Sequence, residues 1–323
     1  MGLLSSTIGS FPKPAELRRA RRQFADEEIE ASDLREVEER AVRDVLKLQE
    51  EIGIDLLVDG EMDRGDMTTH FAERLEGMEI SGLVRSYGNR YYRKPVIVDE
   101  VRRTAPMTVE RWRFAQGTTS RPVKAILTGP YTLMDWSFDE HYPSREACCM
   151  ALGEVVREEA ADLVAAGVRD LQIDEPAISV RPDELDLATR ALATVTADLD
   201  PRVRTWTHIC YGEFGPVMER ILHLPVNGLL LELSNSGFDM LSALGGLPEG
   251  KLLGAGVVDV HTKTVETSEQ IRERIERVLE VLPPEHVWIN PDCGLKTRTP
   301  EEARAKLTAM VAATRAVRES RGL

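Results

Sequence analysis

The sequence predicts an α/β protein: a single (β/α)8 barrel of the TIM type, with residues 1–323 forming one domain. Short apolar runs alternate with long helical patterns along the whole chain. Most of these runs are continuous rather than alternating, as in parallel strands that are buried on both faces. Eight such runs with helices between them are typical of this barrel. An open doubly wound sheet is the alternative, but no Gly-x-Gly-x-x-Gly follows the first strand.

Eight segments are predicted strands, and helical patterns separate most of them. The strand segments are LLSSTIGS, IDLLVDGE, VKAILTGP, RDLQIDEP, RVRTWTHIC, NGLLLELS, KLLGAGVVD and HVWINPDCG. The helical pattern REVEERAVRDVLKLQEEIG has an apolar stripe, with Gly53 just past its end. Residues from about 80 to 122 are too many for an ordinary loop. Their Tyr-Tyr and Val-Ile-Val runs predict a hairpin inserted between strands two and three, over the barrel mouth.

The composition argues against nucleic-acid and membrane partners and indicates a cellular location. Lys and Arg number 41 against 55 Asp and Glu, a net charge of −14, whereas nucleic-acid binding requires a basic surface. We find no apolar run of about 18 residues and no signal-peptide pattern, so we expect no membrane partner. Four cysteines are too few for a disulfide scaffold. These features predict a cytoplasmic location.

Polar residues follow the end of every predicted strand, where the active site of such a barrel lies. Four of them carry metal-binding groups and come from strands five, six and eight: His208, Cys210, Glu232 and Cys293. One imidazole, two thiolates and a carboxylate make a tetrahedral set for Zn²⁺. Taken singly, the cysteines and the glutamate have structural explanations, but together they predict a zinc site.

The charge of this ligand set indicates what the zinc would do. Two thiolates and a carboxylate leave the metal electron-rich, which weakens its power to activate water. A substrate thiol that binds to zinc loses its proton, whereas a free thiol has a pKa of roughly 8.5. The set therefore favours alkyl transfer to sulfur over hydrolysis.

Several stretches resemble the cobalamin-independent methionine synthase family. They are TIGSFP, VDGEMDRGDM, ILTGPYTLMDWSF, QIDEPA, THICYGEF and NPDCGLKTR, in this order along nearly the whole chain. The chain is similar to the catalytic C-terminal barrel and resembles a short core form that lacks the N-terminal barrel. The resemblance implies a zinc-dependent methyltransferase that converts homocysteine to methionine, with the four zinc ligands named above.

The resemblance also implies roles for further residues. Those that would hold the amino and carboxyl groups of homocysteine are Ile8, Gly9, Ser10, Glu61 and Asp174. Asp259 and His261 would lie near the methyl donor as catalytic residues, with His261 a candidate proton relay. Carboxylates suit the α-ammonium of homocysteine, while backbone N–H groups and the Ser10 hydroxyl suit its carboxylate.

The donor side departs from the family pattern. A Ser-Arg-Cys of the family is Asn89-Arg90-Tyr91 here, and a glutamate that contacts the pterin is replaced by Val180. Losing that partner costs about 1–3 kcal/mol. Trp136 is retained as a flat surface for stacking. We therefore expect the donor to be methylcobalamin or a methyl-corrinoid protein rather than a folate.

Four alternatives remain open. The protein is a folate-dependent methionine synthase, or it alkylates another thiol such as coenzyme M. Glu61 and Asp174 argue against coenzyme M, because two carboxylates repel a sulfonate. A non-catalytic carrier or sensor of zinc and thiols would bind homocysteine without turnover. A zinc hydrolase is the weakest alternative, because it requires an open ligand position.

Overall fold

The computed structural model describes residues 2–85, 91–210 and 217–323. These residues form two compact units, each with its own parallel strands. The first unit contains Met1–Asp63, Trp112–Lys124 and Gly228–Leu323, and the second contains Arg64–Arg111 and Ala125–Asn227. The predicted α/β class with parallel strands is confirmed. Closure of the strands into one barrel, and a single domain over 1–323, stay predictions.

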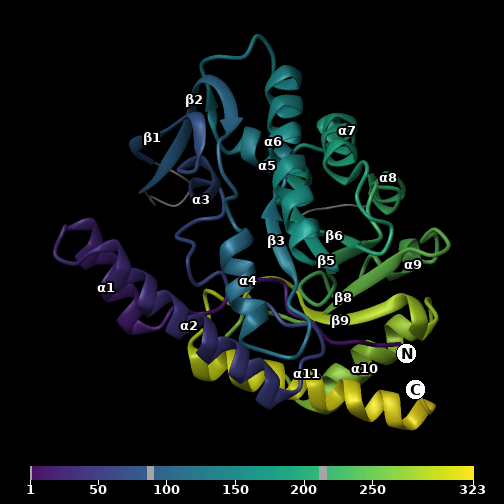
Figure 1. Ribbon diagram of the computed structural model, residues 1–323. Coiled ribbons are helices and arrows are strands. Elements are labelled where there is room, and N and C mark those ends of the chain that lie inside the picture. The colour runs from purple at the N-terminus through teal and green to yellow at the C-terminus, as the bar shows by residue number, and fades with distance from the viewer. Residues whose placement is uncertain (1, 86–90, 211–216) are drawn as a thin grey trace. The chain divides into compact units, whose positions relative to one another are not determined.

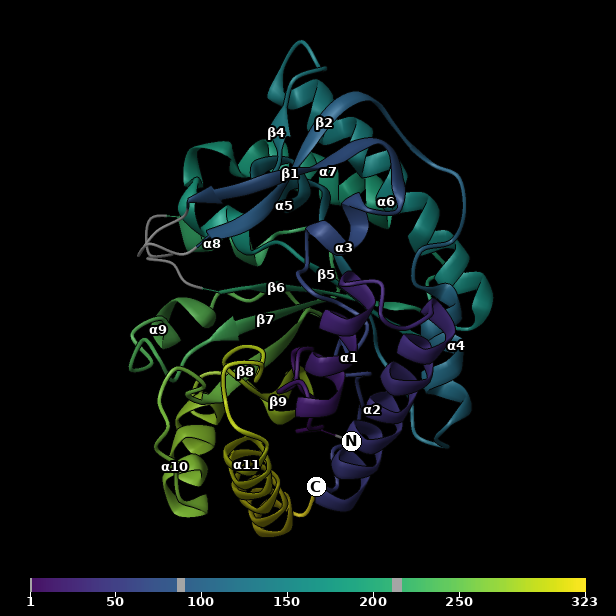
Figure 2. The ribbon, with the colours of Figure 1, turned by 90° about the vertical axis from the view of Figure 1, so that its left-hand side faces the viewer.

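Three parallel strands form the sheet of the first unit, with β8 in the middle (Figure 2). They are β7 (Gly228–Glu232), β8 (Leu252–Val258) and β9 (Val287–Pro291). All their residues but one at the start of β8 are buried, which explains why the sequence shows continuous apolar runs. Their carboxyl ends lie at one edge of this sheet.

The first two predicted strands are reduced to single parallel bridges. Ser5 bridges Ile289, Ser6 bridges Leu56, and Leu57 bridges Val123. The backbone N–H and the hydroxyl of Ser5 both donate to the carboxylate of Asp55, at 2.7 and 2.8 Å. The Ser5 N–H therefore donates to a side chain instead of a neighbouring strand. The parallel pairing at this segment is limited to single bridges.

Helices of different lengths accompany these strands. Those lying wholly in the first unit are α1 (Ala15–Ala25), α2 (Ala31–Ile52), α9 (Leu241–Leu244), α10 (Ser268–Leu279), the 3₁₀ turn Pro284–His286 and α11 (Pro300–Arg321). The α10 and α11 helices lie side by side (Figure 1). As predicted, α2 ends at Gly53, which has φ of 96° and closes the helix in the left-handed region. No helix in the described part of the chain is both long and apolar enough to cross a bilayer.

The second unit has its own parallel strands and a long helical pair. The strands are β3 (Ala125–Thr128), β5 (Asp170–Asp174) and β6 (Arg204–Ile209), with β5 between the other two. The helices are α3 (Thr69–Ala72), α5 (Pro130–Asp135), α6 (Arg145–Ala166), α7 (Leu185–Thr196) and α8 (Met218–Leu222), with 3₁₀ turns at Pro176–Val180 and Pro182–Glu184. α4 (Val109–Gly117) begins in this unit and ends in the first. Ser144 caps α6 by accepting the Ala147 N–H.

An antiparallel pair overlaps the region where the sequence predicts an inserted hairpin. β1 (Leu75–Arg85) pairs with β2 (Tyr91–Arg103), and the two-residue β4 (Phe138–Asp139) adds to β2 in parallel. The pair starts before residue 80, and α4 follows it within the predicted range. A position over a barrel mouth stays a prediction.

The close approach of β8 and β9 leads to a prediction on stability. A Cβ on Gly256 would lie 2.4 Å from Asp292 Oδ1 and 2.7 Å from the Leu231 carbonyl oxygen. Gly256→Ala is therefore expected to destabilise the protein by about 1–3 kcal/mol, because the added methyl has no room. Urea denaturation measures the change. Gly117→Ala is the control, since nothing lies within 4 Å of its Cβ position. Equal stability of the Gly256 variant and the wild type would contradict the packing described.

Candidate functional site

Two predicted metal ligands lie at the carboxyl end of β6 in the second unit. His208 is the last residue but one of the strand, and Cys210 follows the strand directly. Both side chains are buried, with exposed fractions of 3% and 7%. The His208 carbonyl accepts the Glu175 N–H at 3.0 Å, which joins the ends of β5 and β6. His208 and Cys210 each offer one atom that could bind a metal ion, as does Cys293 of the first unit.

Glu175 is a buried carboxylate whose role is not evident from the sequence. It accepts hydrogen bonds from the Tyr131 N–H at 3.0 Å, the Thr132 N–H at 2.8 Å and the Thr132 hydroxyl at 2.7 Å. Burial raises the pKa of Glu175 to about 7, although these donors favour the charged form. Glu175 thus holds the first turn of α5 against the end of β5.

Two residues with predicted substrate or donor contacts also lie in the second unit. Asp174 is buried at the end of β5, and its Oδ1 accepts a hydrogen bond from Gln172 Nε2 at 2.7 Å. Trp136 directly follows α5 and is half-buried, so part of its surface is available to a ligand. Asn89 and Arg90, the other predicted donor-side residues, lie outside the described residues.

The first unit carries the other two predicted ligands. Glu232 is the last residue of β7 and is 5% exposed, and Cys293 lies two residues beyond β9. His261 Nε2 is 3.2 Å from Glu232 Oε1. The hydrogen bond with Glu232 raises the pKa of His261 above its ordinary value, with help from the nearby Cys293 thiol and Asp259. The histidine predicted as a proton relay is thus paired with a predicted metal ligand.

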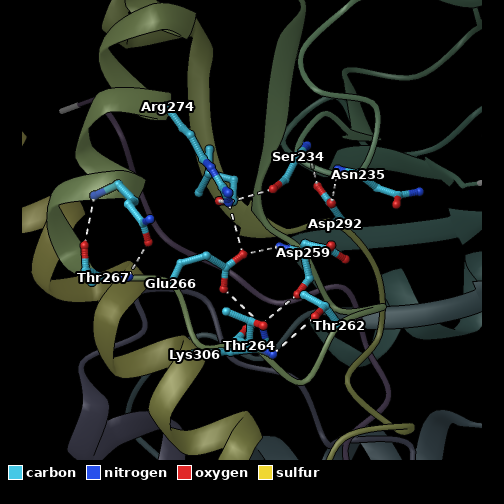
Figure 3. Close-up of polar contacts among 12 residues, drawn as sticks. Ser234, Asn235, Asp259, Thr262, Thr264, Glu266, Thr267, Arg274, Asp292 and Lys306 are labelled. Carbon is cyan, nitrogen blue, oxygen red and sulfur yellow. Dashed lines mark hydrogen bonds and ion pairs between the residues drawn. The ribbon is translucent and has the colours of Figure 1, made fainter.

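Two aspartates shape the loops around this pair. Asp259 Oδ1 accepts the backbone N–H of His261 at 2.7 Å. Asp292 accepts the N–H groups of Leu233, Ser234 and Asn235, at 3.2, 3.0 and 2.7 Å; Figure 3 shows the contacts to the last two. Burial raises the pKa of Asp292 to about 8. Asp292 thus fixes the segment that follows Glu232, a role that the sequence did not predict.

Four of the five residues predicted to hold homocysteine lie in the first unit: Ile8, Gly9, Ser10 and Glu61. Ile8, Gly9 and Ser10 are buried, and the Ser10 carbonyl accepts the Leu295 N–H at 2.7 Å. Glu61 has φ of 54°, in the left-handed region that few residues other than glycine adopt.

Contacts with neighbouring residues hold Glu61 in this conformation. Its N–H donates to Asp59 Oδ1 at 2.8 Å, and the Lys13 ammonium donates to its carbonyl and to that of Gly60. Burial lowers the pKa of Lys13 to about 8, despite the nearby Glu61 carboxylate.

The predicted zinc ligands are divided between the two units. His208 and Cys210 belong to the second, and Glu232 and Cys293 to the first. Their meeting at one ion stays a prediction. Imidazole, thiol and carboxylate groups at the ends of buried parallel strands nevertheless define a class: an α/β protein equipped to bind a borderline metal such as zinc.

The chain belongs to the family described as "Cobalamin-independent synthase, Catalytic domain", which matches residues 3–316. It is 41% identical, over 98% of its length, to a 5-methyltetrahydropteroyltriglutamate–homocysteine methyltransferase of Herpetosiphon aurantiacus. A protein of the same name from Aeromonas salmonicida is 38% identical. The chain spans 43% of the length of each of these relatives.

Two solved structures are similar to the chain. A B12-independent methionine synthase from Shewanella sp. W3-18-1, in complex with selenomethionine, has a TM-score of 0.89 and 29% identity, and 99% of each chain is covered. A putative vitamin-B12-independent methionine synthase from Listeria monocytogenes has a TM-score of 0.83 at 22% identity, which supports the fold alone.

Proposed function

We propose that the protein methylates the thiol of homocysteine to form methionine, with zinc bound by His208, Cys210, Glu232 and Cys293. The observation that carries the proposal is the donor set, which occurs at strand ends in a chain of this family. The names of the relatives support the same reaction.

The residues fit zinc by their chemistry. A histidine, two cysteines and a carboxylate are ordinary zinc ligands, and the burial of His208 and Cys210 limits competition from water. When bound, zinc lowers the pKa of a substrate thiol, so that homocysteine reacts as a thiolate. Glu232 accepts a hydrogen bond from His261, which would orient the carboxylate toward the metal.

The other residues would bind and orient the amino acid. Glu61 and Asp174 supply negative charge for the α-ammonium, and the Ile8-Gly9-Ser10 turn supplies N–H groups for the carboxylate. The left-handed backbone of Glu61, held by Lys13, fixes the direction of its side chain. His261 holds a proton at Nε2 against Glu232, where it would act as the proton relay, with Asp259 fixing its backbone.

We propose methylcobalamin, free or on a corrinoid protein, as the methyl donor. The S–CH₃ bond forms as the Co–CH₃ bond breaks, and the electron pair stays on cobalt. Val180 supports this choice: it is 67% exposed and offers no carboxylate to the amino edge of a pterin. A folate donor is the second candidate, because the named relatives use a methyltetrahydropteroyl compound.

Methionine formation by the purified, zinc-loaded protein tests both parts of the proposal. We expect turnover with homocysteine and methylcobalamin, and little with methyltetrahydrofolate in its mono- or triglutamate form. Turnover with folate alone would overturn the donor. Methylation of coenzyme M without methionine would overturn the substrate. Binding of zinc and homocysteine with no turnover from any donor would indicate a carrier or sensor.

A further inference from the structure

A buried lysine lies beneath the loop that carries His261. Lys306 is on α11, and its side chain has no exposed surface. Its ammonium donates to the Asp259 carbonyl at 2.8 Å, to Glu266 Oε2 at 2.9 Å and to the Thr264 carbonyl (Figure 3). A buried ammonium is unfavourable unless it is paired, and here three acceptors match its three protons.

Glu266 extends these contacts to both sides of the loop. Its Oε1 accepts the Asp259 N–H at 2.8 Å and Arg274 Nη1 at 3.0 Å. The same nitrogen of Arg274, on α10, donates to Ser234 Oγ at 2.6 Å and to the Val257 carbonyl at 2.8 Å. The network therefore joins α10, α11, the end of β8 and the segment after β7 (Figure 3).

The loop between Asp259 and Glu266 is thus fixed at both ends. The Asp259 N–H and C=O are both bonded, to Glu266 and Lys306, so neither adjoining peptide unit is free to rotate. Two residues later, His261 donates its own N–H to the Asp259 side chain and places its ring 3.2 Å from Glu232. The orientation of the ring depends on the Asp259 backbone.

We infer that Lys306 and Glu266 are positioning residues that hold the loop 259–266 so that His261 meets Glu232. Lys306 and Glu266 belong neither to the sequence motifs described above nor to the predicted zinc ligands. A buried ion pair adds little stability compared with apolar side chains of similar size, so orientation is the effect that distinguishes this pair. The consequence for methyl transfer rests on the proposed function.

The test uses Lys306→Met, Glu266→Gln and the double variant. Lys306→Met leaves Glu266 with Arg274 as its one charged partner in the network and removes the donor to the Asp259 and Thr264 carbonyls, so it is expected to be unstable. The double variant removes both charges, keeps similar volumes and retains an oxygen for the Asp259 N–H, so its melting temperature is expected to lie near that of the wild type. Its kcat is expected to fall about 10- to 100-fold, because small misplacements of catalytic groups have effects of this size.

Two further readouts separate positioning from stability. With zinc supplied in excess, the KM for homocysteine is expected to stay unchanged in the double variant, while backbone amides of residues 259–266 exchange faster with solvent. Arg304→Met is the matched control on the same helix, because Arg304 pairs with Glu51 at the exposed surface and should change neither kcat nor exchange.

The outcomes are distinct. A double variant with both stability and kcat restored would overturn the inference, since the pair would then be structural only. If the wild type forms no methionine with any donor, the proposed function fails. The exchange measurement still tests whether Lys306 and Glu266 hold the loop 259–266. In that case faster exchange of residues 259–266 supports the inference, and unchanged exchange overturns it.

Discussion

Replacing Cys210 with serine is expected to weaken zinc binding by more than about 100-fold and to abolish methionine formation. Changes in the groups that only orient metal ligands already cost about 10- to 100-fold, so loss of a ligand should cost more. A serine hydroxyl keeps its proton at neutral pH and is a poor zinc ligand compared with a thiolate. The side chain is buried, so water has little access to the vacant position.

Zinc content after dialysis and competition with a chromogenic chelator measure the effect. Cys293→Ser should behave in the same way, although it lies in the other unit. The matched control is Cys149→Ala, which removes a buried thiol from α6 and should leave the zinc content unchanged. Full zinc occupancy in either serine variant would show that the cysteine is not a ligand.

Replacing Asp292 with alanine is expected to lower the free energy of unfolding by about 3–5 kcal/mol. Three backbone N–H groups, on Leu233, Ser234 and Asn235, would lose their acceptor. An unsatisfied buried donor costs about 1–3 kcal/mol. The Leu233 contact is buried, whereas those of Ser234 and Asn235 are part-buried, so water recovers part of the loss at these two. A decrease of this size is large for a single substitution, since most lower the free energy of unfolding by about 0.5–3 kcal/mol.

Guanidinium denaturation measures this change. Asp292→Asn retains one acceptor oxygen and should lose roughly half as much. If the alanine and asparagine variants are equally stable, the hydrogen bonds from the segment after β7 are not the source of the effect. If both match the wild type, Asp292 does not fix that segment.

Residues at strand ends were predictable because the signal is local. The run that contains His208 is rich in β-branched and apolar residues, and β6 ends where that run ends. Glu232 likewise closes an unbroken leucine run, and the structure makes it the last residue of β7. The pairing of Glu232 with His261 was not predicted, because it depends on the conformation of the loop after β8.

Buried charges with distant partners could not be predicted from local pattern. Lys306 is 47 residues from Asp259, and Glu175 is 43 from Thr132. One signal was present nonetheless: Lys306 shares the buried face of α11 with Leu307 and Met310. A lysine on an apolar helical stripe indicates a buried acceptor. Glu175 has no such signal, because charged residues are expected at every strand end.

The bridge between Ser5 and Ile289 has a consequence for the order of folding. The segment around Ser5 gains this neighbour only after synthesis has reached Ile289, because the two residues lie far apart in the sequence. Contacts of such long sequence separation slow folding. During synthesis, residues 2–10 therefore lack the neighbouring strand that contains Ile289 until late. We expect the Ile8-Gly9-Ser10 turn, which is predicted to bind the substrate carboxylate, to be among the last parts of the first unit to fold.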